Sequence, residues 1–408
     1  MAEPGRDPRP EPPPGRCLAV PTAGTSFGTT ANEELRDVVI TSSGSILAVG
    51  YERASFSPHG MIGGRGIVLE LAPDLSATSQ VGVLDSTGTD SLESIAIAPD
   101  TGAIHAVGRA NGELPDLPGH GGFDWVIGEL TATGGLERRA RGLDGSSEYA
   151  HGVAVGDGGL LAVAGHAQTT RPEGGSSMDP FLAVYDIGDG SASPLWFTSR
   201  RDVANEIYRS VDVSAAQIVA GGDILDGDEQ GMFVTAWDRD AGRLWRRQLS
   251  GRGFDMVTAV DILPGGDVLW AGSSALPLGA SAHGGLDAVV GVLDGTTGEP
   301  RWTMQYGGAG DDHVTDLAVD DQGRIAIVGN TATADPTRSD VDAFLIVLDA
   351  AGNELVNELW TSDGDDRPAA VAMDTCGGIA LVGFTTGHLV DAPRGGRDGF
   401  VLVTRIAE

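Results

Sequence analysis

Lysine is absent from this 408-residue chain, cysteine occurs only twice, and aromatic residues make up 5% of it. The 26 basic residues are therefore all arginine, and with 58 acidic residues they give a formal net charge of −32. Nucleic-acid binding requires clustered positive charge, so this composition argues against a nucleic-acid partner. No apolar run approaches the roughly 18 residues that a membrane-spanning helix requires, and we expect no membrane span.

Glycine is the residue present in excess: 62 Gly, together with 21 Pro, interrupt the chain too often for long helices. Almost every apolar run is short, rich in Val, Ile, Leu and Ala, and bounded by Gly, Asp, Ser or Pro. Such runs are typical of β-strands joined by tight turns. The apolar fraction of 41% is sufficient for a core, which excludes bulk disorder.

These short runs belong to an internal repeat. One run in each repeat ends at a glycine, and this anchor glycine returns at intervals of roughly 55 residues. The seven anchors are Gly50, Gly108, Gly165, Gly221, Gly272, Gly329 and Gly383. A second apolar run lies about twelve residues before each anchor, and the two runs predict a β-hairpin whose turn is rich in Asp and Gly.

A third apolar run follows each hairpin after a long polar loop, and a fourth, more polar run follows in six repeats. Four strands in a repeat of this length are typical of a β-propeller blade. We therefore predict an all-β fold, a seven-bladed β-propeller with four-stranded antiparallel blades. The blades account for residues 17–408 as a single domain, and residues 1–16 are predicted to form a Pro-rich N-terminal linker.

The last repeat ends after its third strand, so a strand from elsewhere must complete it. We expect Leu18–Thr22 to lie beside Phe400–Val403 and close the ring, which removes the free sheet edges. Cys17 immediately precedes this segment, and Cys376 lies in the inner hairpin turn of the last repeat. Two alternatives remain for these cysteines: a disulfide that staples the closure, or two free thiols.

Several third strands begin with a Gly-Gly-x-Asp segment, as in Gly121–Val126, Gly284–Val289 and Gly395–Phe400. With the Asp-x-x-Gly turns that follow, the repeat resembles the bacterial seven-bladed β-propeller repeat family of the SBBP type. The resemblance spans nearly the whole chain, although Arg65–Ile67 and Gly231–Phe233 lack the Asp. It implies the propeller fold and a secreted, periplasmic or cell-surface setting, and it transfers no catalytic residue. A cytoplasmic setting stays open, because residues 1–16 contain no apolar signal-peptide region.

An acidic residue occupies the same place in all seven repeats, shortly before each inner strand. These acids are Glu33, Asp90, Glu148, Glu206, Asp255, Asp312 and Asp366. We expect them on the loops that enter the inner strands, around the mouth of the central channel. One interpretation is a cation site, for which Ca²⁺ is the suited ion because convergent carboxylates bind hard cations. The other is that each acid caps its own loop by accepting backbone N–H bonds, and the two roles are compatible.

Histidines are concentrated in the predicted long loops between second and third strands, where five are expected: His59, His120, His166, His283 and His388. Two more, His151 and His313, lie near the acids. Alternation of strand direction places these loops and the acids on one face, the long-loop face, which is our candidate ligand-binding surface. No His or Cys spacing indicates a transition-metal site within one repeat, and solvated loop histidines are the alternative interpretation.

These observations predict a monomeric, non-catalytic propeller scaffold that binds a protein or small-molecule ligand through the long-loop face. No motif indicates a definite cofactor, and Gly24–Gly28 matches the nucleophile-elbow pattern without its strand-to-helix turn. The alternative function is a propeller enzyme, a hydrolase or lyase that uses the acids with His151 or His313, or a cation-binding protein that uses the acids alone. The acidic surface favours cations or basic partners.

Overall fold

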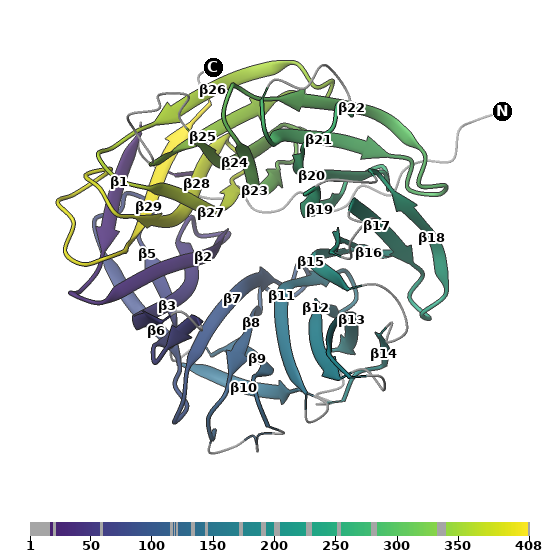
Figure 1. Ribbon diagram of the computed structural model, residues 1–408, viewed down its shortest axis with the longest axis horizontal. Coiled ribbons are helices and arrows are strands. Elements are labelled where there is room, and N and C mark those ends of the chain that lie inside the picture. Colours follow the sequence, from purple (N-terminus) through teal and green to yellow (C-terminus); the bar gives the residue numbers. More distant parts are fainter. Residues whose placement is uncertain are drawn as a thin grey trace.

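The computed structural model forms a closed ring of seven β-sheets around a central axis (Figure 1). It describes residues 17–18, 22–57, 60–114, 117, 119, 121–131, 135–142, 146–170, 174–188, 193–199, 205–225, 231–250, 254–278, 284–332 and 340–406. The predicted linker, 1–16, lies outside the described residues. The sheets confirm the prediction of an all-β, seven-bladed β-propeller with antiparallel blades.

Each blade runs from an inner strand beside the axis to an outer strand at the rim. The inner strands are β2 (Asn32–Ile40), β7 (Asp90–Ile97), β11 (Ser147–Gly156), β15 (Glu206–Val213), β19 (Met256–Ile262), β23 (Asp312–Val319) and β27 (Asp366–Met373). The second strands are β3 (Ile46–Ser57), β8 (Ile104–Ala110), β12 (Leu160–Thr170), β16 (Ile218–Ile224), β20 (Val268–Ser274), β24 (Ile325–Ala332) and β28 (Gly378–Thr385).

The outer half of each blade is built in the same way. The third strands are β5 (Arg65–Leu71), β9 (Asp124–Leu130), β13 (Ser176–Asp186), β17 (Gly231–Trp237), β21 (Asp287–Leu293), β25 (Val341–Leu348) and β29 (Asp398–Arg405). The outer strands are β6 (Thr78–Leu84), β10 (Leu136–Arg141), β14 (Trp196–Ser199), β18 (Arg243–Gln248), β22 (Pro300–Tyr306), β26 (Glu354–Trp360) and β1 (Ala23–Phe27). A short strand, β4 (Gly60–Ile62), adds to β3 in the first blade.

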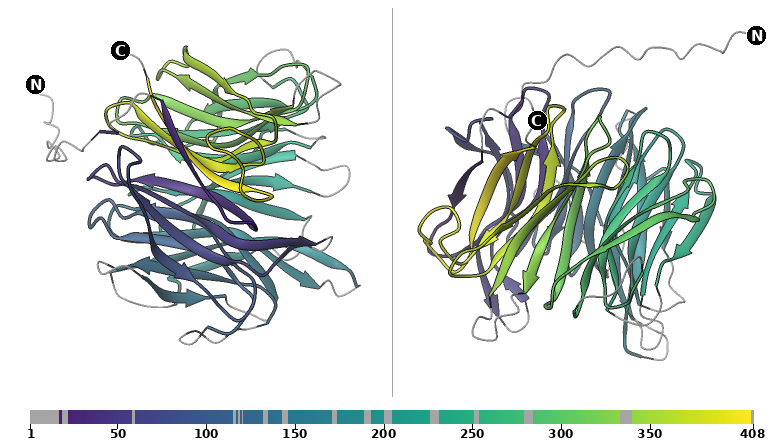
Figure 2. Two further views of the ribbon diagram at one scale, coloured as in Figure 1. Left: turned by 90° about the vertical axis from the view of Figure 1, so that its left-hand side faces the viewer. Right: turned by 90° about the horizontal axis from the view of Figure 1, so that it is seen from above.

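Neighbouring blades pack face to face, and the ring seen edge-on in Figure 2 has loops on its two opposite faces. Seven clusters of buried apolar side chains lie between the sheets, one at each junction of two blades. Val, Ala, Leu and Ile dominate these clusters, and Trp125 and Trp270 are the largest fully buried side chains. The repeated short apolar runs therefore form seven small cores, because each sheet must bury both of its faces.

Every inner strand contains a β-bulge at the same position, three residues after the predicted capping acid. The anchor glycine of the second strand faces this bulge. A Cβ on the anchor would lie 1.8–2.0 Å from a carbonyl oxygen of the inner strand in all seven blades, for example 1.9 Å from Met256 O at Gly272. Only glycine leaves room for that close approach. In the fourth blade the anchor is Gly222, not the predicted Gly221, because Gly222 faces Ile207 O.

The N-terminal segment completes the last blade, as expected, but with a different strand. Strand β1 pairs antiparallel with β29 from Ala23 opposite Val403 to Phe27 opposite Gly399. The predicted closing strand, Leu18–Thr22, is therefore wrong in its position; of its residues, 19–21 lie outside the described part. Outer strands are half exposed, and the polar run at β1 suits that place better than the apolar run at Leu18 does.

Leu18 has a different role at the closure. Its side chain is fully buried in the cluster between the last and first blades. Its backbone N–H donates to Asp374 Oδ2 at 2.8 Å, and its carbonyl accepts a bond from Arg405 Nη2 at 2.6 Å. The residue before it, Cys17, forms a disulfide with Cys376, and the two Cα atoms are 5.8 Å apart. The chain start is thus held at the hairpin end of the last blade before it continues to β1.

Candidate functional site

The central channel is surrounded at its waist by one bulged side chain from each blade. We call this ring the girdle; its members are Arg36, Glu93, His151, Arg209, Thr258, Thr315 and Ala369. A bulge turns one extra residue out of the ladder, and here it turns that residue toward the axis. The girdle lines two cavities, one toward each face of the ring. Three of its members are charged, two are threonines and one is histidine, so the girdle is polar apart from Ala369.

The loop-side cavity, about 410 Å³, opens toward the long-loop face. Besides the girdle it is lined by Glu34, Met256, His313, Val314, Asn330, Arg367, Pro368 and Phe384. The hairpin-side cavity, about 430 Å³, lies toward the face of the inner hairpin turns. Its polar lining beyond the girdle includes Ser94, Ser210 and four aspartates: Asp37, Asp212, Asp261 and Asp316. Beyond the shared girdle, the loop-side cavity therefore carries Arg367, His313 and one carboxylate, Glu34, whereas the hairpin-side cavity carries four carboxylates.

On the first two blades, the charges of the loop-side cavity are satisfied by one another. Glu34 accepts a hydrogen bond from Tyr51 Oη at 2.6 Å and pairs with Arg36 at 3.1 Å and Arg397 at 3.0 Å. Glu93 pairs with Arg109 at 3.5 Å. Although burial opposes it, the charges of Arg109 and Arg36 hold the pKa of Glu93 below its ordinary value. This wall is a closed ion-pair network.

The third and fourth blades contribute girdle residues that are paired with the residue just after the anchor glycine. His151 Nε2 and His166 Nδ1 are 2.9 Å apart, and Arg209 forms an ion pair with the buried Asp223. Burial, reinforced by the charges of Arg209 and Arg109, lowers the pKa of His166 to about 4. Burial and the neighbouring His166 lower the pKa of His151 well below its ordinary value. Both imidazoles are therefore neutral at pH 7, and one can donate to the other.

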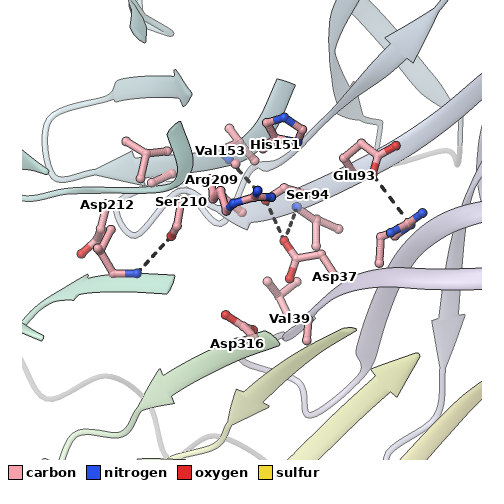
Figure 3. Close-up of a pocket in the computed structure, with 18 of the residues that line it drawn as sticks. Asp37, Val39, Glu93, Ser94, His151, Val153, Arg209, Ser210, Asp212 and Asp316 are labelled. Carbon is pink, nitrogen blue, oxygen red and sulfur yellow. Dashed lines mark hydrogen bonds and ion pairs between the residues drawn. The ribbon is translucent and has the colours of Figure 1, made fainter. Parts of the chain in front are cut away.

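Side chains of the hairpin-side cavity form hydrogen bonds between neighbouring blades (Figure 3). Asp37 Oδ2 accepts from Ser94 Oγ at 2.7 Å and from Ile95 N at 2.8 Å, and Ser94 Oγ accepts from Val153 N at 3.2 Å. In the same way, Val371 N in the seventh blade donates to Asp316 Oδ2 at 2.9 Å. An inner strand has a free edge, and these side chains satisfy N–H groups on that edge.

Burial raises the pKa of all four aspartates of the hairpin-side cavity. Burial raises the pKa of Asp37 to about 6. Burial and the Asp212 carboxylate raise the pKa of Asp261 well above its ordinary value, and burial also raises the pKa of Asp212. Burial and the charge of Asp37 raise the pKa of Asp316 in the same direction. Part of this cluster is therefore protonated at mildly acidic pH.

The seven predicted acids are all buried, and none of them lines either axial cavity. Four bind groups four residues earlier in their own loops: Glu33 binds Thr29, Asp90 binds Ser86, Asp312 binds Gly308 N, and Asp366 binds Ser362. Asp255 accepts from Ala275 N at 2.8 Å, and Glu206 pairs with Arg246 at 2.9 Å. Glu148 lies beside Gly142 in the loop that leads to its own strand. Loop capping is therefore supported for the first four acids, whereas Asp255 and Glu206 bind other segments of the chain.

The predicted histidines are dispersed. His166 lies within β12, not in a loop as expected, because that strand extends five residues beyond its anchor glycine. His151 and His313 line the axial channel, whereas His388 is exposed and bonds Asp363 at 2.8 Å. His59, His120 and His283 lie outside the described residues. Within the described part of the chain, no three His, Cys, Asp or Glu side chains are arranged to hold a metal ion.

Sequence reasoning did not identify the girdle as the channel lining. The signal was present, because each girdle residue stands three positions after a predicted acid, but its identities differ from blade to blade. Because the residue type at this position changes from blade to blade, the position does not stand out when the repeats are compared. The bulge that turns the residue inward is also a property of strand pairing, which single-sequence periodicity does not reveal.

The fold and channel define a closed seven-bladed β-propeller whose first strand completes its last blade. The chain matches no model of a protein family and no curated protein. Among solved structures, a protein of unknown function from Dyadobacter fermentans is similar over 94% of this chain and 98% of its own, at 10% identity with a TM-score of 0.51.

Two further solved structures give lower scores. The β-propeller domain of the trilobed protease from Pyrococcus furiosus, which has an open velcro topology, aligns over 92% of this chain and 96% of its own at 11% identity, with a TM-score of 0.49. Sqt1 from Chaetomium thermophilum aligns over 93% and 97% at 15% identity, with a TM-score of 0.47. At these identities the similarity concerns the fold alone. No helix in the described residues is long and apolar enough to cross a bilayer.

Proposed function

We propose that this protein is a binding propeller whose ligand enters the loop-side cavity from the long-loop face. The observation that carries the proposal is the cavity itself: about 410 Å³, on the axis, with lining side chains from all seven blades. Binding sites are concave and combine apolar walls with a few convergent polar groups. Here Met256 and Phe384 provide apolar surface, and Arg367 and His313 provide polar groups. Such a site belongs to the ring as a whole, so it requires the closed propeller.

The engagement of the acids in contacts within the scaffold supports binding over the cation site and over an enzyme built on those acids. A carboxylate that accepts hydrogen bonds from its own loop, as Asp90 does from Ser86 N and Oγ, is engaged in holding the scaffold. The acids then shape the long-loop face indirectly, because they fix the loops that surround the cavity.

A protein partner is compatible with the same face. Phe254 is 75% exposed, and Phe56 and Ile62 are also exposed; all three lie in or beside loops of the long-loop face. Exposed aromatic and aliphatic side chains around a polar centre are typical of contact surfaces between proteins. A protein that inserts one group into the loop-side cavity would cover them.

We also propose that the chain belongs to the SBBP-type repeat family and that the protein is exported. The Gly-Gly-x-Asp segments support the first. The disulfide between Cys17 and Cys376 supports the second, because such bonds persist in oxidising compartments such as the periplasm, the cell surface and the extracellular medium.

Blocking the waist tests the proposed function. Ala369 is the smallest girdle residue, and Ala369→Trp would fill the loop-side cavity. The control is Ala351→Trp, which adds the same side chain at an exposed turn on the other face. Each protein is dialysed to equilibrium against a metabolite extract, and retained compounds are measured by mass spectrometry. We expect a compound retained by the wild type and by Ala351→Trp but not by Ala369→Trp; equal retention by all three, or none by any, would contradict the proposal.

A further inference from the structure

The loop-side cavity has two unlike walls. Its lining carboxylates, Glu34 and Glu93, both lie on the first two blades, where arginines neutralise them. The wall from the fifth to the seventh blade contains no carboxylate among its lining residues. It presents a guanidinium, an imidazole, an amide and two hydroxyls instead, from Arg367, His313, Asn330, Thr258 and Thr315. In a chain with a net charge of −32, a wall with no lining carboxylate is an exception.

The groups of this wall are weakly engaged with the protein. Arg367 reaches Asn330 Oδ1 at 3.4 Å through Nη1 and Asp365 at 3.5 Å through Nη2, and its side chain is 40% exposed. The hydroxyls of Thr258 and Thr315 reach backbone carbonyls only at 3.4 and 3.3 Å. By contrast, Arg209 in the same cavity is held by Asp223 through two nitrogens. The Arg367 fork is therefore the cationic group with the most capacity for a new acceptor.

We propose that this wall binds the carboxylate of a small, largely apolar molecule; the inference rests on the proposed function. The Arg367 guanidinium presents the planar donor pair that matches a carboxylate. His313 and the Asn330 amide group stand on the adjoining strands β23 and β24, where they are placed to donate as well. Met256, Val314, Pro368 and Phe384 line the remainder of the wall and suit a hydrocarbon or aromatic body.

Charge selects a monoanion over a phosphate. The hairpin-side cavity, which shares the girdle with this site, holds four aspartates. Together with the net charge of the chain they repel a dianion more strongly than a monoanion. A carboxylate attached to an apolar body is therefore the oxyanion that this wall accommodates.

Isothermal titration calorimetry with four related probes tests the inference: phenylacetate, its neutral amide, phenyl phosphate and phenethylamine. We expect phenylacetate to bind at least tenfold more tightly than any other probe. Arg367→Gln should weaken phenylacetate binding at least tenfold, and Asn330→Asp, which places a carboxylate in the wall, should abolish it. The control is Arg247→Gln, on the outer strand β18, which removes an equal charge outside the cavity.

Equal affinity for phenylacetate and its amide, tighter binding of phenyl phosphate, or full affinity in Arg367→Gln would overturn the inference. Failure of every probe to bind would overturn it as well. The proposed function fails separately, since it predicts a ligand that Ala369→Trp excludes whatever the charge of that ligand. Circular dichroism of each variant distinguishes lost binding from lost fold. Asn330→Asp is nearly isosteric, so it tests the charge of the wall with little change in its shape.

Discussion

The disulfide between Cys17 and Cys376 closes the ring, and its removal should destabilise the whole propeller. The two cysteines are 359 positions apart, so the bond constrains almost the entire unfolded chain. In the chain-entropy description, a closed loop of that length lowers the entropy of the unfolded state by an amount worth about 6 kcal/mol at 25 °C. Residual structure in the unfolded chain reduces this value, and we expect a measured loss of about 3–6 kcal/mol.

The perturbation is the double substitution of both cysteines by alanine, which leaves no unpaired thiol. Urea unfolding followed by tryptophan fluorescence gives the free energy of unfolding for the wild type and the variant. Reductant should lower the urea midpoint of the wild type to that of the variant, and it should leave the variant unchanged. The slope of the free energy against urea should increase once the bond is absent, because the unfolded chain is then less compact.

The destabilisation should begin at the ring closure. Without the bond, the start of the chain is held by Leu18 and by the pairing of β1 with β29. Amide hydrogen exchange should therefore accelerate first in Ala23–Phe27 and in the facing residues of β29, while the fourth and fifth blades keep their protection. Equal urea midpoints with and without reductant, in protein shown by mass spectrometry to carry the bond, would refute the reasoning.

Two further predictions concern the bulge and the aspartates. Gly272→Ala should lower the free energy of urea unfolding by about 1–3 kcal/mol or more, because its Cβ would lie 1.9 Å from Met256 O. The control is Gly265→Ala, whose Cβ would have nothing within 4 Å, and it should stay within about 0.5 kcal/mol of the wild type. Asp316→Asn should stabilise the protein by on the order of 1 kcal/mol at pH 8 and not below about pH 4, because burial and a neighbouring carboxylate raise the pKa of Asp316 in the folded state. The carboxyl is therefore destabilising once the pH rises through its folded pKa, and the asparagine amide oxygen can keep the bond from Val371 N at 2.9 Å. Comparable cost for both glycine variants, or a stability change in Asp316→Asn that is the same at pH 4 and pH 8, would contradict these expectations.

The sequence by itself determined the number of blades, their strand order and the face that carries the long loops. These features follow from short-range patterns: an apolar run, a turn with glycine at positive φ such as Gly102 or Gly377, and an anchor glycine that faces a bulge. Each pattern is local and recurs around the ring, the glycine turn in six blades and the other two in all seven, so errors in one blade are corrected by the others. The single-residue shift from Gly221 to Gly222 and the displaced closing strand show where repetition gives no help.

The tertiary structure alone decided what lines the channel. Arg36, Arg209 and Arg367 are far apart in the chain and differ in their local sequence, and only the closed ring places them in one cavity. The seven acids lie off the axis, where four of them bind their own loops, and the bulge three positions later turns a different residue of each inner strand toward the channel. A repeat in sequence therefore specified the scaffold, and the non-repeated side chains at one position of each blade specified the site, since a site on the axis is made by contacts between blades.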